Sequence, residues 1–230
     1  MKYEESNIRF SAFDLLLQLP LFQGMSRDDL TEVVAHTKMD FSKKSAGHVV
    51  AHTDTPCQQL IFILKGDINV TTTAIDRHYS VSETLHAPLA LQPERLFGLQ
   101  QQYSHTYTTA APCQLLTISK TDIMQLSSRF LIFRINLLNI IATQVQKAEQ
   151  QRWHRQPEAL TLRIATFLKQ HCLYPAGEKT FHIRMNDLAR ELNDSRLNIS
   201  HALNAMQAQG LLTLKRGVIL IPQIEKIKHN

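Results

Sequence analysis

The spacing of hydrophobic residues changes twice along the chain, and each change predicts a different kind of element. Residues 11–19 have the helical period, and Ser26 before an acidic first turn is a typical start of a second helix. From about Phe41 the pattern becomes a series of short apolar runs separated by turn residues. In the clearest run, LIFILKGDINVTT, we expect Gly66 to form a tight turn between strands at 60–64 and 68–72. Further runs at 79–81, 106–109 and 114–118 complete the pattern of a small antiparallel barrel or roll.

A long helical region is predicted from residue 119 to residue 155, which contains neither Gly nor Pro. It carries two adjoining apolar stripes, which is more than a helix packed on one surface needs. We therefore expect one stripe to cover the roll and the other to meet a second copy of the chain. The candidate interface residues are Phe133, Leu137, Leu138, Ile141 and Val145. Pro157 is expected to end the helix and to act as a hinge.

The helical period returns after Pro157. An amphipathic helix at 159–172 is followed by a short strand at 180–185 and by two short helices within 188–212. Two more strands then flank a turn at Arg216-Gly217. Helix, strand, two helices and hairpin, in this order, describe a winged helix-turn-helix.

The second of these two short helices has an unusual outer face. Asn193 suits a left-handed turn between the helices, and Ser195 is placed to cap the second one. The side chains left pointing outward or sideways are Arg196, Leu197, Asn198, Ser200, His201 and Asn204. Arg, Asn and His suit base edges and phosphates, whereas the Glu and Lys pairs of a solvated helix are missing. The pattern favours DNA recognition, and an ordinary helical hairpin with a solvated face is the alternative.

Composition and charge narrow the classes of protein. With 230 residues, 43% of them hydrophobic, the chain suits one large domain or two modest ones with a real core. The formal net charge is +5, and residues 157–230 hold ten Lys or Arg against six Asp or Glu. Most of the positive charge thus lies with the two short helices, which fits a phosphate-backbone partner.

Other classes of protein are disfavoured by what the sequence lacks. Three widely spaced cysteines without C-x-x-C pairing argue against a disulfide framework, a zinc site or an iron–sulfur cluster. The amino-terminal residues carry no signal-peptide pattern, and the longest apolar zone, 130–142, is interrupted by polar residues. We therefore expect a cytoplasmic protein with no membrane partner.

The segment SRLNISHALNAMQAQGLL resembles the recognition helix of the Crp/Fnr superfamily of bacterial transcription regulators. The segments LARELN, LIFILKGDINV and CQLLTISKTDI fit the same family, so the resemblance covers nearly the whole chain. It implies an α+β fold with an N-terminal antiparallel β-roll of the cyclic-nucleotide-binding-like type, a long dimerisation helix and a C-terminal winged helix-turn-helix. The implied domains are 1–120 for the roll, 121–156 for the dimerisation helix and hinge, and 157–230 for DNA binding.

The resemblance also assigns roles to residues of the second short helix. It implies that Ser195 contacts phosphate and that Arg196 and His201 read bases. Leu197 stands where the catabolite activator often has Glu, which would accept from cytosine, so the target sequence must differ. The candidate DNA-binding residues are Ser195, Arg196, Asn198, Ser200, His201, Lys215 and Arg216.

The sensor half departs from the family at its phosphate cassette, Gly-Glu-Leu…Arg-Ser/Thr-Ala. Here Gln92-Pro93 stands in place of Gly-Glu, and Tyr103 stands in place of the arginine that pairs with the cyclic phosphate. Proline removes a backbone donor and tyrosine supplies no cation, so we expect no binding of cyclic AMP. Arg95 is the nearest substitute cation. The candidate effector pocket consists of Gln92, Glu94, Arg95, Tyr103 and Ser104.

A few aromatic residues and histidines raise two other possible ligands, a flat effector and a metal ion. Tyr103, Tyr107 and Phe97 either line a pocket for a flat effector or belong to the core of the roll. His48 and His52 share one face of a strand, but they lie about 13 Å apart along it, too far for one metal. No metal and no cofactor are expected.

The sequence thus predicts a homodimeric regulator that reads a palindromic DNA site through residues 195–209 and is not controlled by cyclic AMP. Catalysis is not expected, because the chain has no Gly-rich phosphate loop, H-E-x-x-H or G-x-S-x-G motif. The alternative is an effector-binding or protein-interaction module whose winged helix does not read DNA sequence. The expected partners are double-stranded DNA and a second copy, with RNA polymerase and an unidentified small-molecule effector as further candidates.

Overall fold

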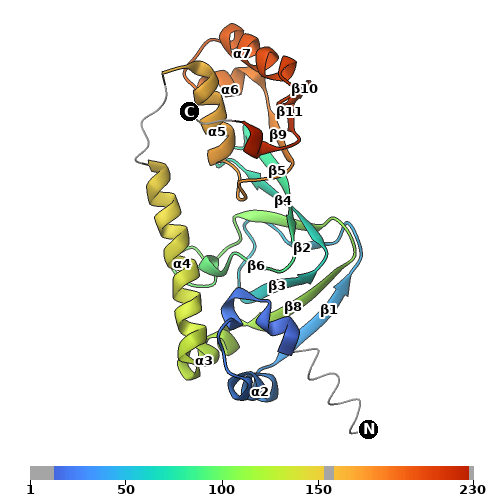
Figure 1. Ribbon diagram of the computed structural model, residues 1–230, viewed down its shortest axis with the longest axis vertical. Coiled ribbons are helices and arrows are strands. Elements are labelled where there is room, and N and C mark those ends of the chain that lie inside the picture. The colour runs from blue at the N-terminus through green and yellow to red at the C-terminus, as the bar shows by residue number, and fades with distance from the viewer. Residues whose placement is uncertain (1–12, 153–157, 228–230) are drawn as a thin grey trace. The chain divides into compact units, whose positions relative to one another are not determined.

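The computed structural model describes residues 13–152 and 158–227, which form helices and antiparallel sheets (Figure 1). The α+β class is thereby confirmed. By its contacts the chain divides into two compact units. The first unit consists of Met1–Ile68, His86–Ser104 and Thr108–Gln150, and the second of Asn69–Leu85, His105–Tyr107 and Gln151–Asn230. This division differs from the predicted boundaries, because residues 69–85 group with the carboxyl-terminal residues.

The first unit begins with helical segments that close one end of its core. Residues 13–17 are helical, and the short helix η1 (Pro20–Phe22) and the helix α2 (Arg27–His36) follow. Ser26 caps α2 as predicted: its Oγ accepts the Asp29 N–H over 3.1 Å, and the Asp29 carboxylate accepts the Ser26 N–H over 3.3 Å. Leu30 and Val33 form the buried face of α2, which packs on the core.

Behind these helices lies a four-stranded antiparallel sheet in the order β1-β8-β3-β6. Its strands are β1 (Met39–Lys44), β8 (Cys113–Ser119), β3 (Gln59–Lys65) and β6 (Leu89–Leu91). The five central residues of β3 are all buried, as expected of a strand covered on both faces. Strand β7 (His105–Thr109) follows the run predicted at 106–109, and it belongs with the short strand β2 (Val49–Ala51) to the other sheet.

The predicted hairpin at Gly66 is wrong. Strand β3 pairs with β8 and β6, whereas β4 (Asp67–Thr73) belongs to the other sheet. Gly66 has φ +99°, and a Cβ there would lie 2.7 Å from Cys113 Sγ and 2.8 Å from the Pro112 carbonyl oxygen. Gly66 is therefore a corner that redirects the chain between two sheets, a place that only glycine fits.

The predicted continuous helix from 119 to 155 is also wrong, because it breaks at Phe130. Helix α3 (Lys120–Arg129) and helix α4 (Leu131–Arg152) meet at a bend of 118°. Phe130 between them has an extended backbone, with φ −111° and ψ 109°, and its ring is buried. Burial of this ring outweighs the local helical preference. The predicted hinge at Pro157 lies outside the described residues.

No single helix in the described ranges is both long and apolar enough to cross a membrane. Helices α3 and α4 pass a test of length and composition only when they are taken together, across their bend of 118°.

The second unit carries three helices on one face of a sheet (Figure 1). Helices α5 (Leu160–Gln170), α6 (Met185–Glu191) and α7 (Arg196–Ala208) enclose a core with strand β9. Strands β10 (Thr213–Lys215) and β11 (Val218–Ile221) form a hairpin, and the sheet continues in the order β10-β11-β9-β5-β4, with β9 at Lys179–Ile183 and β5 at Tyr79–His86. The buried side chains include Ile164, Leu168, Phe181, Leu188, Ile199 and Leu203.

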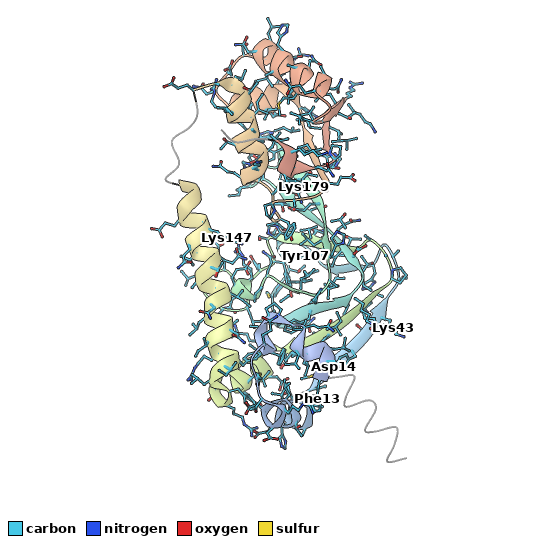
Figure 2. All side chains as sticks on the ribbon, viewed as in Figure 1. Phe13, Asp14, Lys43, Tyr107, Lys147 and Lys179 are labelled. Carbon is cyan, nitrogen blue, oxygen red and sulfur yellow. The ribbon has the colours of Figure 1, made fainter. Side chains whose placement is uncertain are left out.

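A buried ion pair joins β5 to β9. Glu83 and Lys179 face each other in the strand register, and the Lys179 Nζ donates to Glu83 Oε2 over 2.8 Å (Lys179 is labelled in Figure 2). Each side chain is only 1% exposed. The carboxylate also accepts the backbone N–H groups of Leu173 over 2.7 Å and of Tyr174 over 3.1 Å. Both charges are thus compensated, as buried charges must be.

Replacement of one partner of this pair should be costly. In Lys179→Met the Glu83 carboxylate stays buried without its counter-charge, so we expect the free energy of unfolding to fall by about 3–5 kcal/mol. Urea unfolding followed by circular dichroism measures the difference. Lys226→Met, on an exposed residue, is the control and should change stability by no more than about 0.5 kcal/mol. Equal stability of the two variants would contradict the buried pair.

Candidate nucleic-acid interface

Helix α7 is held in place by its first turn and by its buried face. Asn193 adopts the left-handed conformation that the sequence predicted, with φ +47°. Ser195 caps the helix, and its Oγ accepts the Asn198 N–H over 3.1 Å. Ile199 and Leu203 are fully buried, which fixes the rotation of α7 about its own axis and leaves the opposite face to solvent.

The exposed face of α7 carries most of the predicted reading residues. Arg196, Asn198 and His201 are exposed, whereas Ser200 is half-buried at the edge of the face. Ser200 Oγ accepts the Asn204 side chain over 3.4 Å. Leu197 is 66% exposed among these polar groups. An exposed leucine beside hydrogen-bonding side chains fits apolar contact with a thymine methyl group.

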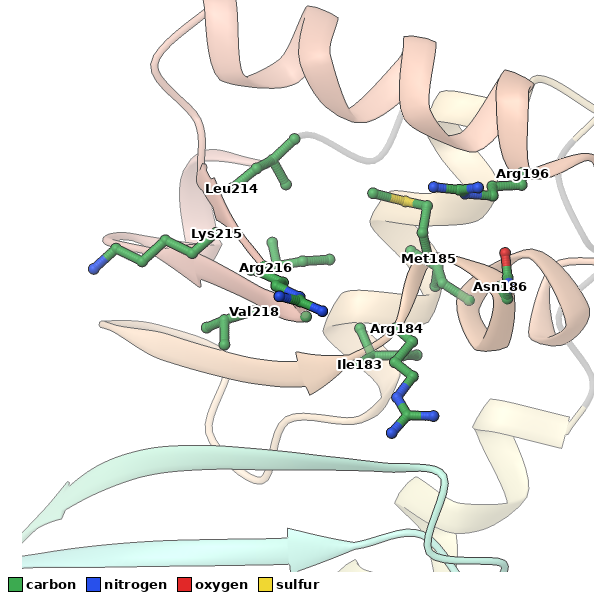
Figure 3. Close-up of a pocket in the computed structure, with 12 residues that line it drawn as sticks. Ile183, Arg184, Met185, Asn186, Arg196, Leu214, Lys215, Arg216 and Val218 are labelled. Atoms are coloured by element: carbon green, nitrogen blue, oxygen red, sulfur yellow. The ribbon is translucent and has the colours of Figure 1, made fainter.

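The β10–β11 hairpin lies beside α7 and is tied to it. Gln207 Oε1 of α7 accepts the Leu214 N–H over 2.6 Å, and Gly217 completes the turn with φ +70°. Between the hairpin and the starts of α6 and α7 lies a hollow of about 680 Å³ (Figure 3). Its lining includes four cations, Arg184, Arg196, Lys215 and Arg216, and no carboxylate. Such a lining attracts an anion such as a phosphate.

The side chains of these cations point in different directions (Figure 3). Arg196 extends from the start of α7 and Arg216 from the hairpin turn into the hollow, whereas Lys215 points away from it. Arg184 was not predicted from the sequence. Its only sequence signal is its place directly before α6, and the fold is needed to bring it beside Arg216.

The carboxylate of Asp194 lies next to the cap of α7. Hydrogen bonds from the Asn198 side chain and the Ser195 backbone, together with Arg163, hold the pKa of Asp194 below its usual range. Asp194 therefore remains ionised at neutral pH. Its contribution to the stability of the fold is fully present above the ordinary pKa of an aspartate and is lost as the pH falls through the lowered pKa.

A second candidate surface is the exposed face of α4, which runs along the first unit (Figure 1). Leu131, Ile135, Leu138, Ala142 and Val145 are exposed on it and follow one another at intervals of four, three, four and three residues. The four larger side chains are between 41% and 61% exposed. This spacing is the heptad repeat by which two helices pack together.

Two of the interface residues predicted on α4 are buried and do not lie on its exposed face. Phe133 and Leu137 are buried within the first unit, where the Phe133 ring lies 5.2 Å from the Phe22 ring. They are therefore unavailable to a second copy. Leu138 and Val145 are exposed as predicted, and Ile141 is half-buried beside them.

Several side chains of the predicted effector cassette are buried or bind one another. Gln92 has a left-handed backbone, with φ +41°, and its side chain is buried. Its Nε2 donates to Ser104 Oγ over 2.6 Å, and its Oε1 accepts the Ser104 N–H over 3.0 Å. Tyr103 is 4% exposed and donates its hydroxyl to the Gln59 carbonyl over 3.2 Å, and burial raises its pKa. Of the two alternatives for Tyr103, Tyr107 and Phe97, burial in the core is observed for the two tyrosines, whereas Phe97 is half-buried.

Two cations remain at the outside of the cassette. Arg95 is half-buried and donates to Gln100 Oε1 over 3.2 Å. Lys120 donates to Gln101 Oε1 over 2.6 Å and lies 5.2 Å from the centre of the Phe97 ring. The sequence did not predict Lys120, because it starts α3 and is brought to the cassette only by folding. Glu94 is half-buried beside them.

No protein-family model matches the chain, and no curated protein matches it. Among solved structures, a regulator assigned to the crp/fnr family from Eubacterium rectale is 16% identical, and the match covers 90% of this chain and 95% of that one with a TM-score of 0.51. The sensor domain of the transcriptional regulator DNR from Pseudomonas aeruginosa is 17% identical, with 66% of this chain and 97% of that one covered and a TM-score of 0.53. The catabolite activator protein of Thermus thermophilus is 18% identical, with 90% and 97% covered and a TM-score of 0.49.

The first two likenesses show that the chain has the fold of Crp/Fnr-type regulators. The resemblance predicted from the sequence is confirmed at the level of the fold.

Proposed function

We propose that the protein is a homodimeric, sequence-specific DNA-binding transcription regulator of the Crp/Fnr type. In this proposal α6, α7 and the β10–β11 hairpin form a winged helix-turn-helix, and α7 reads the major groove of a palindromic site. The observation that supports it most is the exposed face of α7, which carries Arg196, Asn198 and His201, together with a hollow at its start that Arg196 and three further cations line without a carboxylate. This combination provides base-reading groups and phosphate-binding groups on one surface.

The two kinds of contact fall on different residues. Arg196 and Asn198 lie in the first turn of α7, the part of a recognition helix that reaches base edges. The hydroxyl of Ser195 accepts the Asn198 N–H and keeps its own proton to donate to a phosphate. Arg184, Lys215 and Arg216 line the hollow on one side of the start of α7 and suit a flanking DNA backbone.

The exposed heptad face of α4 supports the dimeric part of the proposal. A two-fold dimer presents two copies of α7, which requires a two-fold symmetric site with half-site centres about 10–10.5 bp apart. The alternative, a protein-interaction module, keeps the fold but predicts no preference for any duplex. Selection of duplexes from a random pool by the 230-residue protein decides between them: an enriched inverted repeat supports the proposal, and failure to enrich any sequence contradicts it.

Salt dependence and single substitutions should separate base contacts from phosphate contacts. On the selected duplex, Arg196→Ala should lose about 1–3 kcal/mol of binding free energy and relax the preference at one base pair per half-site. Lys215→Ala or Arg216→Ala should instead weaken binding to all duplexes alike and reduce the steepness of the salt dependence. Fluorescence anisotropy between 50 and 200 mM salt, in which wild-type affinity should fall roughly 10³-fold, measures both. Unchanged affinity and preference in Arg196→Ala would show that α7 does not read the bases.

The dimer should depend on the exposed stripe of α4 and not on its neighbours. Leu138→Glu combined with Val145→Glu places two charges in the proposed helix pair, so we expect a monomer at micromolar concentration in sedimentation velocity. Gln144→Glu, exposed on the same helix but outside the heptad stripe, is the control and should remain dimeric. A wild-type monomer at this concentration would disprove the dimer.

Cyclic AMP should not bind, because the groups that would hold its phosphate are absent or already paired. Tyr103 replaces the expected cation and points into the core, and Gln92 and Ser104 satisfy each other. A ligand at a hundredfold excess over its Kd stabilises a protein by about 2.7 kcal/mol, so thermal unfolding with millimolar cyclic AMP or cyclic GMP is a sensitive test. We expect no change in Tm. A rise in Tm that Arg95→Ala or Lys120→Ala abolishes would show that a different set of cations holds the phosphate.

A further inference from the structure

The side-chain amide of Asn198 is held in one orientation at the start of α7. Its Nδ2 donates to Asp194 Oδ1 over 2.8 Å, and the same oxygen accepts the Ser195 N–H over 2.8 Å. An ionised carboxylate only accepts hydrogen bonds, so the nitrogen of the amide and not its oxygen must face Asp194. The carbonyl oxygen and the second N–H of Asn198 therefore remain for a partner on the exposed side of the helix.

Asp194 is itself fixed from the other side by Arg163 of α5. Arg163 Nη2 donates to Asp194 Oδ2 over 2.5 Å, and Nη1 donates to the Leu192 carbonyl over 2.8 Å. The two charged side chains are only 20% and 14% exposed, so water and salt screen this pair less than a surface pair. Because the charges of the pair cancel, Asp194 can stay next to a DNA backbone without strong repulsion of the phosphates.

From this arrangement we propose that Arg163 and Asp194 determine base specificity by fixing the Asn198 amide as a reader of adenine, an inference that rests on the proposed function. An acceptor oxygen and a donor N–H side by side match the N6 amino group and N7 of adenine in the major groove. Guanine presents two acceptors there, one of which would face the Asn198 oxygen. An untethered asparagine can rotate its amide to suit another base, and the hydrogen bond to Asp194 prevents this rotation.

The test measures base preference as well as affinity, because a purely structural role would change only affinity and stability. Wild-type protein selects a duplex from a random pool, and anisotropy then gives the Kd for all four bases at each half-site position. Asn198→Ala should lose an adenine preference of about 10–100-fold at one position. Asp194→Ala should lose most of that preference at the same position, and the double variant should lose no more than Asn198→Ala alone.

Conservative variants separate the roles of acceptor and charge. Asp194→Asn keeps an acceptor oxygen for Asn198 and should retain most of the adenine preference, while it loses the ion pair with Arg163. Asp194→Ser still accepts the Ser195 N–H but is too short to hold Asn198, so it replaces Asp194→Ala if that variant does not fold. Asp187→Ala is the control, since Asp187 pairs with Arg190 within α6, and it should keep the wild-type preference.

The outcomes distinguish this inference from the function on which it rests. If wild-type protein enriches no sequence, the proposed function fails and the inference fails with it. If a sequence is enriched but Asp194→Ala and Asp194→Ser keep the full adenine preference, the proposed function stands and the inference is overturned. A preference for guanine at the position that Asn198 controls would overturn it as well.

Discussion

The placement of α7 depends on a single buried carboxylate. Glu83 on β5 binds the ammonium group of Lys179 and the backbone N–H groups of Leu173 and Tyr174. Lys179 is the first residue of β9, and α6 begins one residue after Arg184, which follows the end of that strand. A slip of one residue between β5 and β9 would put the two charges on opposite faces of the sheet. The cost of an unpaired buried charge therefore makes this register strict, and the register decides where α6 and α7 start.

The same pairing explains why the chain does not divide where its composition changes. Strand β9 pairs with β11 on one side and with β5 on the other, and Val81 of β5 belongs to the core that Phe181 and Ile164 form. Residues 158–227 alone would leave β9 as a sheet edge with unpaired backbone groups and an unpaired Lys179. The segment that carries the proposed reading helix is thus completed by residues 69–85, which come from the first half of the sequence.

Features that depend on neighbouring residues were predictable, and those that depend on distant ones were not. Ser26 and Ser195 cap α2 and α7 as expected, because a cap is decided within four residues. The break at Phe130 was missed, because it depends on the burial of a ring in a core that the sequence alone does not reveal. Among the site residues, Arg196 and His201 were predicted from helical spacing, whereas Arg163 and Arg184 come from other elements and reach α7 only by folding.

The side-chain amides of Gln92 and Asn198 differ in how many of their hydrogen-bonding groups remain for a partner. Gln92 is buried, and both ends of its amide bind Ser104, which stabilises a left-handed backbone that glutamine otherwise avoids. A ligand there would have to break two hydrogen bonds before it formed any. Asn198 is exposed, and its tether to Asp194 occupies one N–H group. The amide of Asn198 is therefore oriented in advance and still has an acceptor and a donor for a partner, so binding there loses little conformational entropy and displaces no internal hydrogen bond.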